Sequence, residues 1–387
     1  LHGSEHSFPT RRSSDLAQFP VSPSGKADRK NLARLEFTFD TNTADGPHGL
    51  LEQQISEIIA GVLGRSQFGV TEDFFAAGGN SLAALSVIAK IEENLGKTLS
   101  IGALFANPTV KGLAAVLNED STDVEFAPVL PLREVDSATS KNTVPLFILP
   151  PAGGLGWCYA AYLPYIPGHP SVYALQHEAF TNPNAGYAQS LRELAEGYLA
   201  RIRETLEERQ LPSQFSLMGW SVGGTAAVEV AALAETAGYD VQQVTLLDAY
   251  PVEQWQGIPE PDEQESFRAL LRMGGLPEVS AQTVLDLPQT LERLRDAGSA
   301  MGYLPEDKLE VCLESMRASA ALMRGSNHLN FGGKVVLIGV SHDDQPYLDA
   351  HGWEPHVGSF RTVTLKNGTH PDLVNPERIP EIIAEAF

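Results

Sequence analysis

The sequence around Ser221 constrains the fold most strongly, because it joins a predicted buried strand to a predicted helix through a tight turn. The apolar run 215–218 is typical of a strand, and the small residues of 224–231 favour a helix. Between them, Gly-Trp-Ser-Val-Gly occupies residues 219–223, a spacing typical of a nucleophile elbow. Glycines let strand and helix pass closely, and the helix N-terminus favours negative charge on a reacting oxygen. The stretch therefore predicts Ser221 as a catalytic nucleophile.

Further apolar runs predict a mostly parallel sheet that is covered on both faces by helices. The expected strands are 144–149, 171–175, 215–218, 244–247, 334–340 and 360–365. Helical sequence such as 191–206 separates most of them, and this alternation is typical of an α/β fold. About 80 residues of charged, helical sequence interrupt the alternation. We therefore expect an α/β-hydrolase domain at 144–387 with a helical lid insertion at about 252–331.

The acid of a catalytic triad is expected after the nucleophile in the chain, at the carboxyl end of a strand. Asp248 directly follows the strand expected at 244–247 and is the favoured candidate. Asp343 and Asp344 follow the next expected strand. They remain the alternatives, because either strand can supply the acid.

The base is expected last in the chain, and His370 has the matching position. It follows the final expected strand and precedes the C-terminal helix. The other late histidines, His342, His351 and His356, lack this placement, and His342 follows a strand that is one too early in the order. We therefore predict that His370 takes the proton of the Ser221 hydroxyl.

Two backbone amides are needed to hold the oxyanion that forms during acyl transfer. Val222 directly follows the nucleophile and is expected to provide one of them. The loop after the first expected strand, residues 150–157, begins with two prolines and continues with small residues, so its backbone can approach the reacting oxygen closely. Ala152 is the favoured second donor, with Gly153 as the alternative.

A small helical unit is expected ahead of this domain, at 45–119. Apolar residues at helical spacing predict helices at 51–63, 81–95 and 110–117, so we expect an all-α four-helix bundle. The bundle contains Asp-Phe-Phe at 73–75 and Gly-Gly-Asn-Ser-Leu at 78–82. Ser81 follows two glycines that permit a sharp turn, and it starts a helix whose free amides favour a phosphodiester. A simple N-cap role for Ser81 is the alternative.

The remaining segments lack hydrophobic periodicity. Residues 120–143 are polar and acidic, and they predict a linker between the two domains. Residues 1–18 are expected to be disordered or artefactual and are set aside. Residues 19–36 are different, because they combine a proline-rich start with Ser-Gly-Lys at 24–26 and a basic stretch after it.

The composition argues against several classes of function. A net charge of −22 disfavours nucleic acid and anionic membranes as partners. The two cysteines, Cys158 and Cys312, have no paired spacing, so no metal site or disulfide framework is expected and a cytoplasmic location is favoured. No apolar run is long enough to span a membrane.

Together these motifs resemble the end of a nonribosomal peptide synthetase. The string around Ser81 resembles a peptidyl carrier domain, while Gly-Trp-Ser-Val-Gly-Gly, Leu-Leu-Asp-Ala-Tyr-Pro and Gly-Thr-His-Pro-Asp-Leu match the type I thioesterase pattern. The resemblance covers nearly all of residues 50–387. Within the family, these residues are most similar to the terminal modules of siderophore synthetases. Residues 19–36 resemble the last motif of an adenylation domain, in which a lysine at the position of Lys26 binds the acyl-adenylate.

The resemblance implies a cofactor, partners and an activity. Ser81 would carry 4'-phosphopantetheine, attached by a phosphopantetheinyl transferase, and upstream condensation and adenylation domains would supply a peptidyl thioester. Ser221, with His370 and Asp248, would take over the peptide and release it by hydrolysis or macrocyclisation. The alternative is a stand-alone serine esterase or lipase-like hydrolase with an appended helical bundle, which predicts activity that does not depend on Ser81.

Overall fold

The structure is a computed structural model, in which the chain forms two units, 1–46 and 47–387. The described residues all belong to the second unit: 50–65, 67–118, 126–135, 143–163, 165–274, 276, 279–297, 299–325, 327–342, 345, 347–375 and 378–387. The predicted segments 1–18 and 19–36, with Lys26, lie outside the described residues, as do the alternative acids Asp343 and Asp344.

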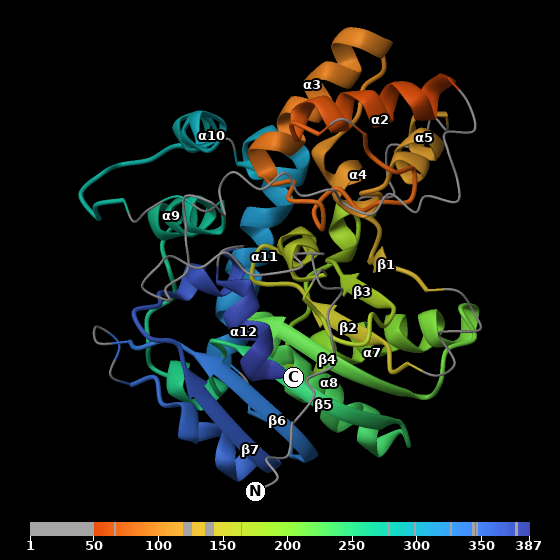
Figure 1. The fold of residues 1–387 in the computed structure, drawn as a ribbon. Coiled ribbons are helices and arrows are strands. Elements are labelled where there is room, and N and C mark those ends of the chain that lie inside the picture. The colour runs from red at the N-terminus through yellow and green to blue at the C-terminus, as the bar shows by residue number, and fades with distance from the viewer. Residues whose placement is uncertain are drawn as a thin grey trace, which may run out of the picture. The chain divides into compact units, whose positions relative to one another are not determined.

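Four helices form the predicted bundle within the described part of the chain (Figure 1). They are α2 (Leu50–Val62), α3 (Ser81–Leu95), α4 (Ile101–Ala106) and α5 (Val110–Asn118). Fully buried apolar side chains at helical spacing fill its core, among them Ile55, Ile59, Val87, Ile91, Leu104 and Leu113. The all-α class and the three helices predicted individually are confirmed, and α4 is the fourth.

Packing against Phe74 fixes the loop that leads into α3. The Asp73 carboxylate accepts hydrogen bonds from the amides of Phe75 and Ala76 at 2.8 and 2.9 Å, a turn typical of aspartate. The Phe74 ring is fully buried, and a Cβ at Gly79 would lie 2.4 Å from it. Only glycine fits at this position, which explains why aromatic and glycine residues occur together in this part of the sequence.

The second domain is built on a seven-stranded sheet with the strand order β1-β3-β2-β4-β5-β6-β7. Neighbouring strands are parallel except for the pair β1 and β3. The strands are β1 (Val129–Arg133), β2 (Leu146–Leu149), β3 (Val172–Leu175), β4 (Gln214–Trp220), β5 (Asp240–Leu247), β6 (Phe331–Gly339) and β7 (Val357–Thr364). The six predicted strands and the mostly parallel α/β-hydrolase class are confirmed.

Strand β1 lies inside segment 120–143, which the sequence predicted to be a linker, and the prediction is wrong for these residues. Leu130 and Leu132 of β1 are buried, and the strand pairs antiparallel with β3 at the edge of the sheet. Pro131 cannot donate to a neighbouring strand, which an edge strand tolerates. Five residues with a proline at the centre give too short an apolar pattern to distinguish a strand from a linker.

Helices cover both faces of the sheet (Figure 1). Helices α7 (Leu191–Glu208) and α8 (Val222–Thr236) pack on one face, and α12 (Ile379–Ala386) packs on the other. Because successive side chains of a strand point to opposite faces, Leu149 packs with α7 and α8 while Ile148 belongs to the core on the α12 side. This double coverage explains why the central strands are apolar at nearly every position.

Between β5 and β6 the chain leaves the sheet and forms a helical insertion. It contains η4 (Val252–Trp255), α9 (Glu263–Met273), α10 (Leu287–Asp296), η5 (Ala300–Tyr303) and α11 (Glu306–Gly325). These elements fall within the residues for which the sequence predicted a lid. Neither here nor elsewhere in the described residues is any helix long and apolar enough to cross a bilayer.

A buried polar cluster joins the two ends of the insertion. The Val252 amide donates to Nε2 of His328 at 3.0 Å, and Nδ1 of His328 lies 2.7 Å from Oε1 of Glu229 on α8. Since Nε2 accepts, Nδ1 carries the proton and donates to the carboxylate. The Leu329 amide donates to the same carboxylate oxygen at 2.8 Å. The segments that leave and re-enter the sheet therefore meet at one point on α8.

Candidate active site

Ser221 occupies the turn between β4 and α8 with a positive φ of 57° and a ψ of −130°. A residue with a side chain is strained at positive φ, so the surrounding packing must hold it there. A Cβ at Gly219 would lie 2.3 Å from the backbone of Gly223, and a Cβ at Gly223 would lie 2.4 Å from the carbonyl oxygen of Pro150. Both glycines of the predicted elbow are thus required by close backbone contacts.

Asp248 directly follows β5 and is brought together with His370. The Nδ1 atom of His370 lies 2.6 Å from Oδ2 of Asp248 and donates to it, because a carboxylate only accepts. His370 begins η7 (His370–Val374), whose start is fixed by hydrogen bonds from Thr369 to the carboxylate of Asp372 at 2.8 Å. With Nδ1 donating, Nε2 is the ring nitrogen left to accept a proton.

Three further groups donate to the buried carboxylate of Asp248. The Nε2 atom of His342 lies 3.0 and 2.9 Å from its two oxygens, the Tyr250 hydroxyl lies 2.9 Å from Oδ1, and the Val340 amide lies 3.1 Å from Oδ1. Burial by itself raises the pKa of Asp248, but hydrogen bonds from His342 and His370 outweigh it and hold that pKa well below its usual range. The carboxylate stays charged and can stabilise a positive imidazole.

His342 is the site residue that sequence reasoning missed. Its place after β6 does not match a base, which is expected after β7. Parallel strands end at the same edge of a sheet, so a residue just after β6 reaches the region occupied by the residue after the neighbouring β5. The pairing of β5 with β6 is the signal that could have identified His342 as a neighbour of Asp248, although it does not identify His342 as a base.

The two predicted oxyanion donors line the same cavity as Ser221. Val222 is the first residue of α8, where amides have no partner within the helix. Ala152 follows β2, and its carbonyl oxygen accepts a long hydrogen bond of 3.5 Å from the Ser319 hydroxyl of α11. Neither amide donates to an acceptor within the described part of the chain, so both are available to an oxyanion.

Tyr159 links the two strands that carry the nucleophile and the oxyanion loop. Its hydroxyl donates to the carbonyl of Leu149 at 2.8 Å and accepts the amide of Trp220 at 2.9 Å. Leu149 precedes the oxyanion loop, and Trp220 precedes Ser221. Burial raises the pKa of Tyr159 well above its usual range, so the hydroxyl stays protonated and can keep both bonds.

A cavity of about 810 Å³ connects the candidate catalytic residues with the insertion. Ser221, Asp248 and His370 line one side, and residues of α9 and α11 line another. The Ser221 hydroxyl makes no hydrogen bond to His370 within the described structure, and such contacts often tighten only when substrate binds. The Trp220 ring lies 4.9 Å from the His370 ring, measured between centroids, and limits its rotation.

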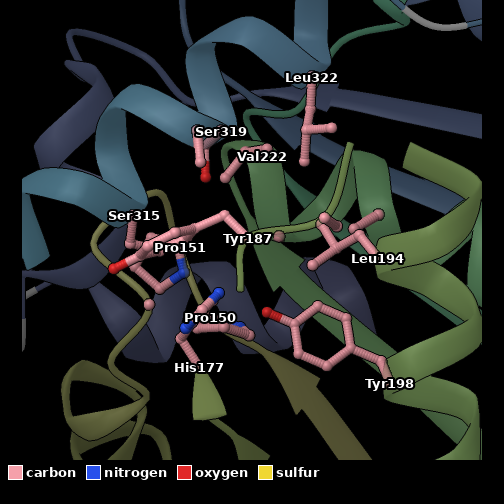
Figure 2. Close-up of a pocket in the computed structure, with 15 residues that line it drawn as sticks. Pro150, Pro151, His177, Tyr187, Leu194, Tyr198, Val222, Ser315, Ser319 and Leu322 are labelled. Carbon is pink, nitrogen blue, oxygen red and sulfur yellow. The ribbon is translucent and has the colours of Figure 1, made fainter. Parts of the chain in front are cut away.

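A second cavity, of about 20 Å³, lies behind the start of α8 (Figure 2). Figure 2 shows Pro150, Pro151, Val222 and Ser319 among the side chains around it. A space of roughly 10–15 Å³ holds one water molecule, so this cavity can take a water but no acyl chain. The larger cavity is therefore the candidate substrate site.

The backbone around Ser81 fits a phosphopantetheine group. Gly78 makes the preceding turn with a φ of 101°, and Ser81 is the first residue of α3. The Asn80 side chain accepts the Ala83 amide at 2.9 Å, so Asn80 is the N-cap and the alternative that Ser81 has this role is wrong. No acidic residue stands in the first turn of α3, so the helix N-terminus can stabilise a phosphodiester.

Comparison with protein families gives a match for each domain. Residues 144–387 match the family model described as thioesterase domain, and residues 53–117 match the model described as phosphopantetheine attachment site. The second family implies covalently attached 4'-phosphopantetheine. Within the described residues, no group of three or more His, Cys, Asp or Glu side chains is placed to hold a metal ion.

The chain is similar to much longer nonribosomal peptide synthetases. It is 31% identical over 371 residues to the dimodular nonribosomal peptide synthase of Bacillus subtilis (strain 168), covering 95% of this chain and 15% of that protein. It is 29% identical over 380 residues to enterobactin synthase component F of Escherichia coli (strain K12), covering 95% and 27%. A four-domain nonribosomal peptide synthetase bound to AMP and glycine shares the fold, with a TM-score of 0.57 at 20% identity over 95% of this chain and 28% of that one.

Proposed function

The chain belongs to the thioesterase domain family, and we propose that it is the terminal carrier–thioesterase pair that releases a peptide from a nonribosomal peptide synthetase. The observation that carries this proposal is the 2.6 Å hydrogen bond between His370 and Asp248 on the wall of the cavity that Ser221 also lines. A serine at a strained elbow, a histidine oriented by a buried carboxylate and two free amides are the groups that acyl transfer requires.

We further propose that Ser81 carries the phosphopantetheine, whose thiol holds the acyl chain as a thioester. The amides at the start of α3 stabilise the phosphate. The modification requires a phosphopantetheinyl transferase, and upstream condensation and adenylation domains supply the peptidyl chain. The motif around Lys26 is then the tail of the preceding adenylation domain. Both cysteines are free thiols, which supports a reducing compartment such as the cytoplasm.

In the first step, Oγ of Ser221 attacks the thioester carbonyl while Nε2 of His370 takes the hydroxyl proton. The ionised carboxylate of Asp248 stabilises the positive imidazole, and the amides of Val222 and Ala152 donate to the oxyanion. The C–S bond then breaks, His370 gives its proton to the departing sulfur, and the acyl chain remains as an ester on Ser221.

In the second step, His370 takes a proton from the nucleophile that attacks the acyl ester, the bond between the acyl carbon and Oγ of Ser221 breaks, and His370 returns the proton to Oγ. Water gives a linear acid, whereas a hydroxyl or amine of the acyl chain gives a ring. Met316, Ser319 and Met323 of α11 line the cavity, so the insertion forms part of the space in which the acyl chain must fold. We propose that the insertion acts as a lid and influences this choice by limiting the access of water.

The test is intact mass spectrometry after incubation with coenzyme A and a phosphopantetheinyl transferase. The wild type should gain one phosphopantetheinyl group, and Ser81→Ala should gain none. With an acyl group loaded on the carrier, the wild type should release the acyl chain and Ser221→Ala should retain it. A mass gain that survives Ser81→Ala would sink the carrier assignment.

The alternative of a stand-alone esterase can be distinguished from the proposed function by the substrates that the chain cleaves. It predicts that free oxygen esters are cleaved efficiently, at a rate that Ser81→Ala does not change. The proposed function predicts that release of the carrier-bound chain disappears with Ser81→Ala, because no acyl chain can be loaded.

A further inference from the structure

The part of the large cavity that the insertion forms carries positive charge, although the chain as a whole has a net charge of −22. The charged side chains of the insertion that line the cavity are Glu265, Arg272 and Arg324. Glu265 pairs with Arg272 and also with Arg268, whose Nε lies 2.9 Å from its carboxylate. Arg268 also lies 3.9 Å from a carboxylate oxygen of Asp262, so these carboxylates and arginines balance, and the charge of Arg324 has no counterpart in this group.

Three backbone carbonyls hold the guanidinium of Arg324 in a fixed orientation. Its nitrogens donate to the oxygens of Ile258, Ala320 and Pro259 at 2.7, 2.7 and 2.8 Å. These bonds leave further N–H donors of the guanidinium for a ligand. No carboxylate oxygen of the described residues lies within 4.0 Å of the guanidinium nitrogens of Arg324. Glu260 attracts Arg324 only over a longer distance. The side chain is therefore a preorganised cation on the cavity wall.

The position of Arg324 along α11 relates it to the reacting carbonyl. Ser319, five residues earlier, contacts Ala152 of the oxyanion loop at 3.5 Å. A helix rises 1.5 Å per residue, so Arg324 lies about 7.5 Å further along the axis of α11. An extended chain spans about 3.3–3.6 Å per residue, so this offset corresponds to about two residues of a peptide.

Aromatic side chains complete the surroundings of this part of the cavity. Trp255 and Tyr347 both line the cavity, with ring centroids 6.2 Å apart. Ile258 and Pro259, whose carbonyls hold Arg324, also line it. Apolar walls lower the local dielectric constant and strengthen the attraction between a fixed cation and an anion.

We propose that Arg324 binds an acidic side chain of the acyl substrate, about two residues before the thioester carbonyl. The inference rests on the proposed function and names the substrate class for the same site. A carboxylate can accept from the remaining donors of the guanidinium, and charge-assisted bonds of this kind are among the strong ones. A neutral amide at the same position lacks the negative charge that Arg324 would offset.

The experiment uses the intact chain and two tripeptidyl pantetheine thioesters, which carry glutamate or glutamine two residues before the thioester. The wild type should show a kcat/KM about tenfold higher for the glutamyl substrate. Arg324→Gln should remove this preference, and Arg324→Lys should keep part of it. Arg317→Gln is the matched control, because Arg317 lies on the same helix, pairs with Glu314 and does not line the cavity. It should retain the full preference.

Equal kcat/KM values for the two substrates in the wild type would overturn the inference. So would a preference that survives Arg324→Gln, or an equal loss for both substrates, which would mean that Arg324 only anchors the loop at 258–259 to α11. A wild type that turns over neither thioester would overturn the proposed function and this inference with it. Turnover of both at equal rates would leave the proposed function standing and remove only the acidic subsite.

Discussion

The imidazoles of His342 and His370 donate to the same oxygen of Asp248, Oδ2, at 2.9 and 2.6 Å. Only His370 follows the last strand, where the base of such a fold is expected. His342 reaches the carboxylate from the end of β6 and contacts both of its oxygens. It therefore restricts the rotation of Asp248 and holds the oxygen that orients His370.

We expect His342→Ala to lower kcat for peptide release about tenfold, because Asp248 loses a donor that fixes its orientation. His342→Gln keeps an N–H donor and should recover most of the rate. Steady-state kinetics with one thioester checks this, and KM should change little. Equal losses of kcat in both variants would contradict a hydrogen-bonding role for His342.

The second prediction concerns the identity of the acid. Asp248→Asn should reduce acyl-enzyme turnover by about 10⁴, since the imidazole loses the charge that stabilises its protonated form. Asp343→Asn and Asp344→Asn are the comparison variants and should stay close to wild type. Activity retained in Asp248→Asn together with loss in one of the other two would move the acid to that residue.

The lowered pKa of Asp248 predicts a pH dependence of stability. Its folded-state pKa lies below the unfolded value, so the ionised group contributes stability that is fully present above about pH 4 and is lost as pH falls through the folded-state pKa. The difference in unfolding free energy between wild type and Asp248→Asn should therefore shrink below about pH 4. Urea unfolding at a series of pH values measures it, and a difference that grows on acidification would contradict the prediction.

The fourth prediction compares two glycines. A Cβ at Gly223 would lie 2.4 Å from the carbonyl oxygen of Pro150, so Gly223→Ala should lower the free energy of unfolding by about 1–3 kcal/mol. A Cβ at Gly197, within α7, would have no atom within 4 Å apart from the neighbouring backbone of its own helix, so Gly197→Ala should stabilise the chain by about 0.5–1 kcal/mol. Urea unfolding of both variants tests the contrast, and similar effects would refute the close-contact explanation.

The last prediction concerns transfer between the domains. Ser81 and Ser221 lie on separate domains of one chain, so acyl transfer between them is intramolecular, with an effective concentration on the order of millimolar for a short flexible linker. The transfer rate should be independent of protein concentration across a dilution series followed by intact mass. Ser221→Ala should leave the acyl group on the carrier, and His370→Ala should slow both its arrival on Ser221 and its release. A rate proportional to concentration would show transfer between chains.

The sequence predicted best those features in which a close contact dictates the residue type. Gly219 and Gly223 face backbone atoms at distances no side chain tolerates, and Gly79 faces the Phe74 ring. The continuous apolar strands were predicted equally well, because strands that are covered by helices on both faces are apolar at nearly every position. These constraints act over a few residues and leave a local signature.

The features that escaped prediction depend on contacts between distant segments. His342 meets Asp248 only because β5 and β6 are neighbours in the sheet, which residue spacing does not encode. The pair of Glu229 and His328 is separated by 99 residues in the sequence. Strand β1 was hidden for another reason, since its edge position permits a proline and requires few apolar residues.

The cluster of Glu229, His328 and Val252 has a consequence for how such chains can diversify. Because the Val252 amide nitrogen and Nε2 of His328, near the two ends of the insertion, are only 3.0 Å apart, the intervening segment can change in length and sequence without moving β5, β6 or the residues that follow them. A segment whose two ends are joined in this way can be exchanged as a unit, and Glu229 of α8 fixes the position of both ends. Exchanging the segment between Val252 and His328 among related thioesterase domains would therefore replace the cavity wall that α9 and α11 form and leave Ser221, Asp248 and His370 unchanged.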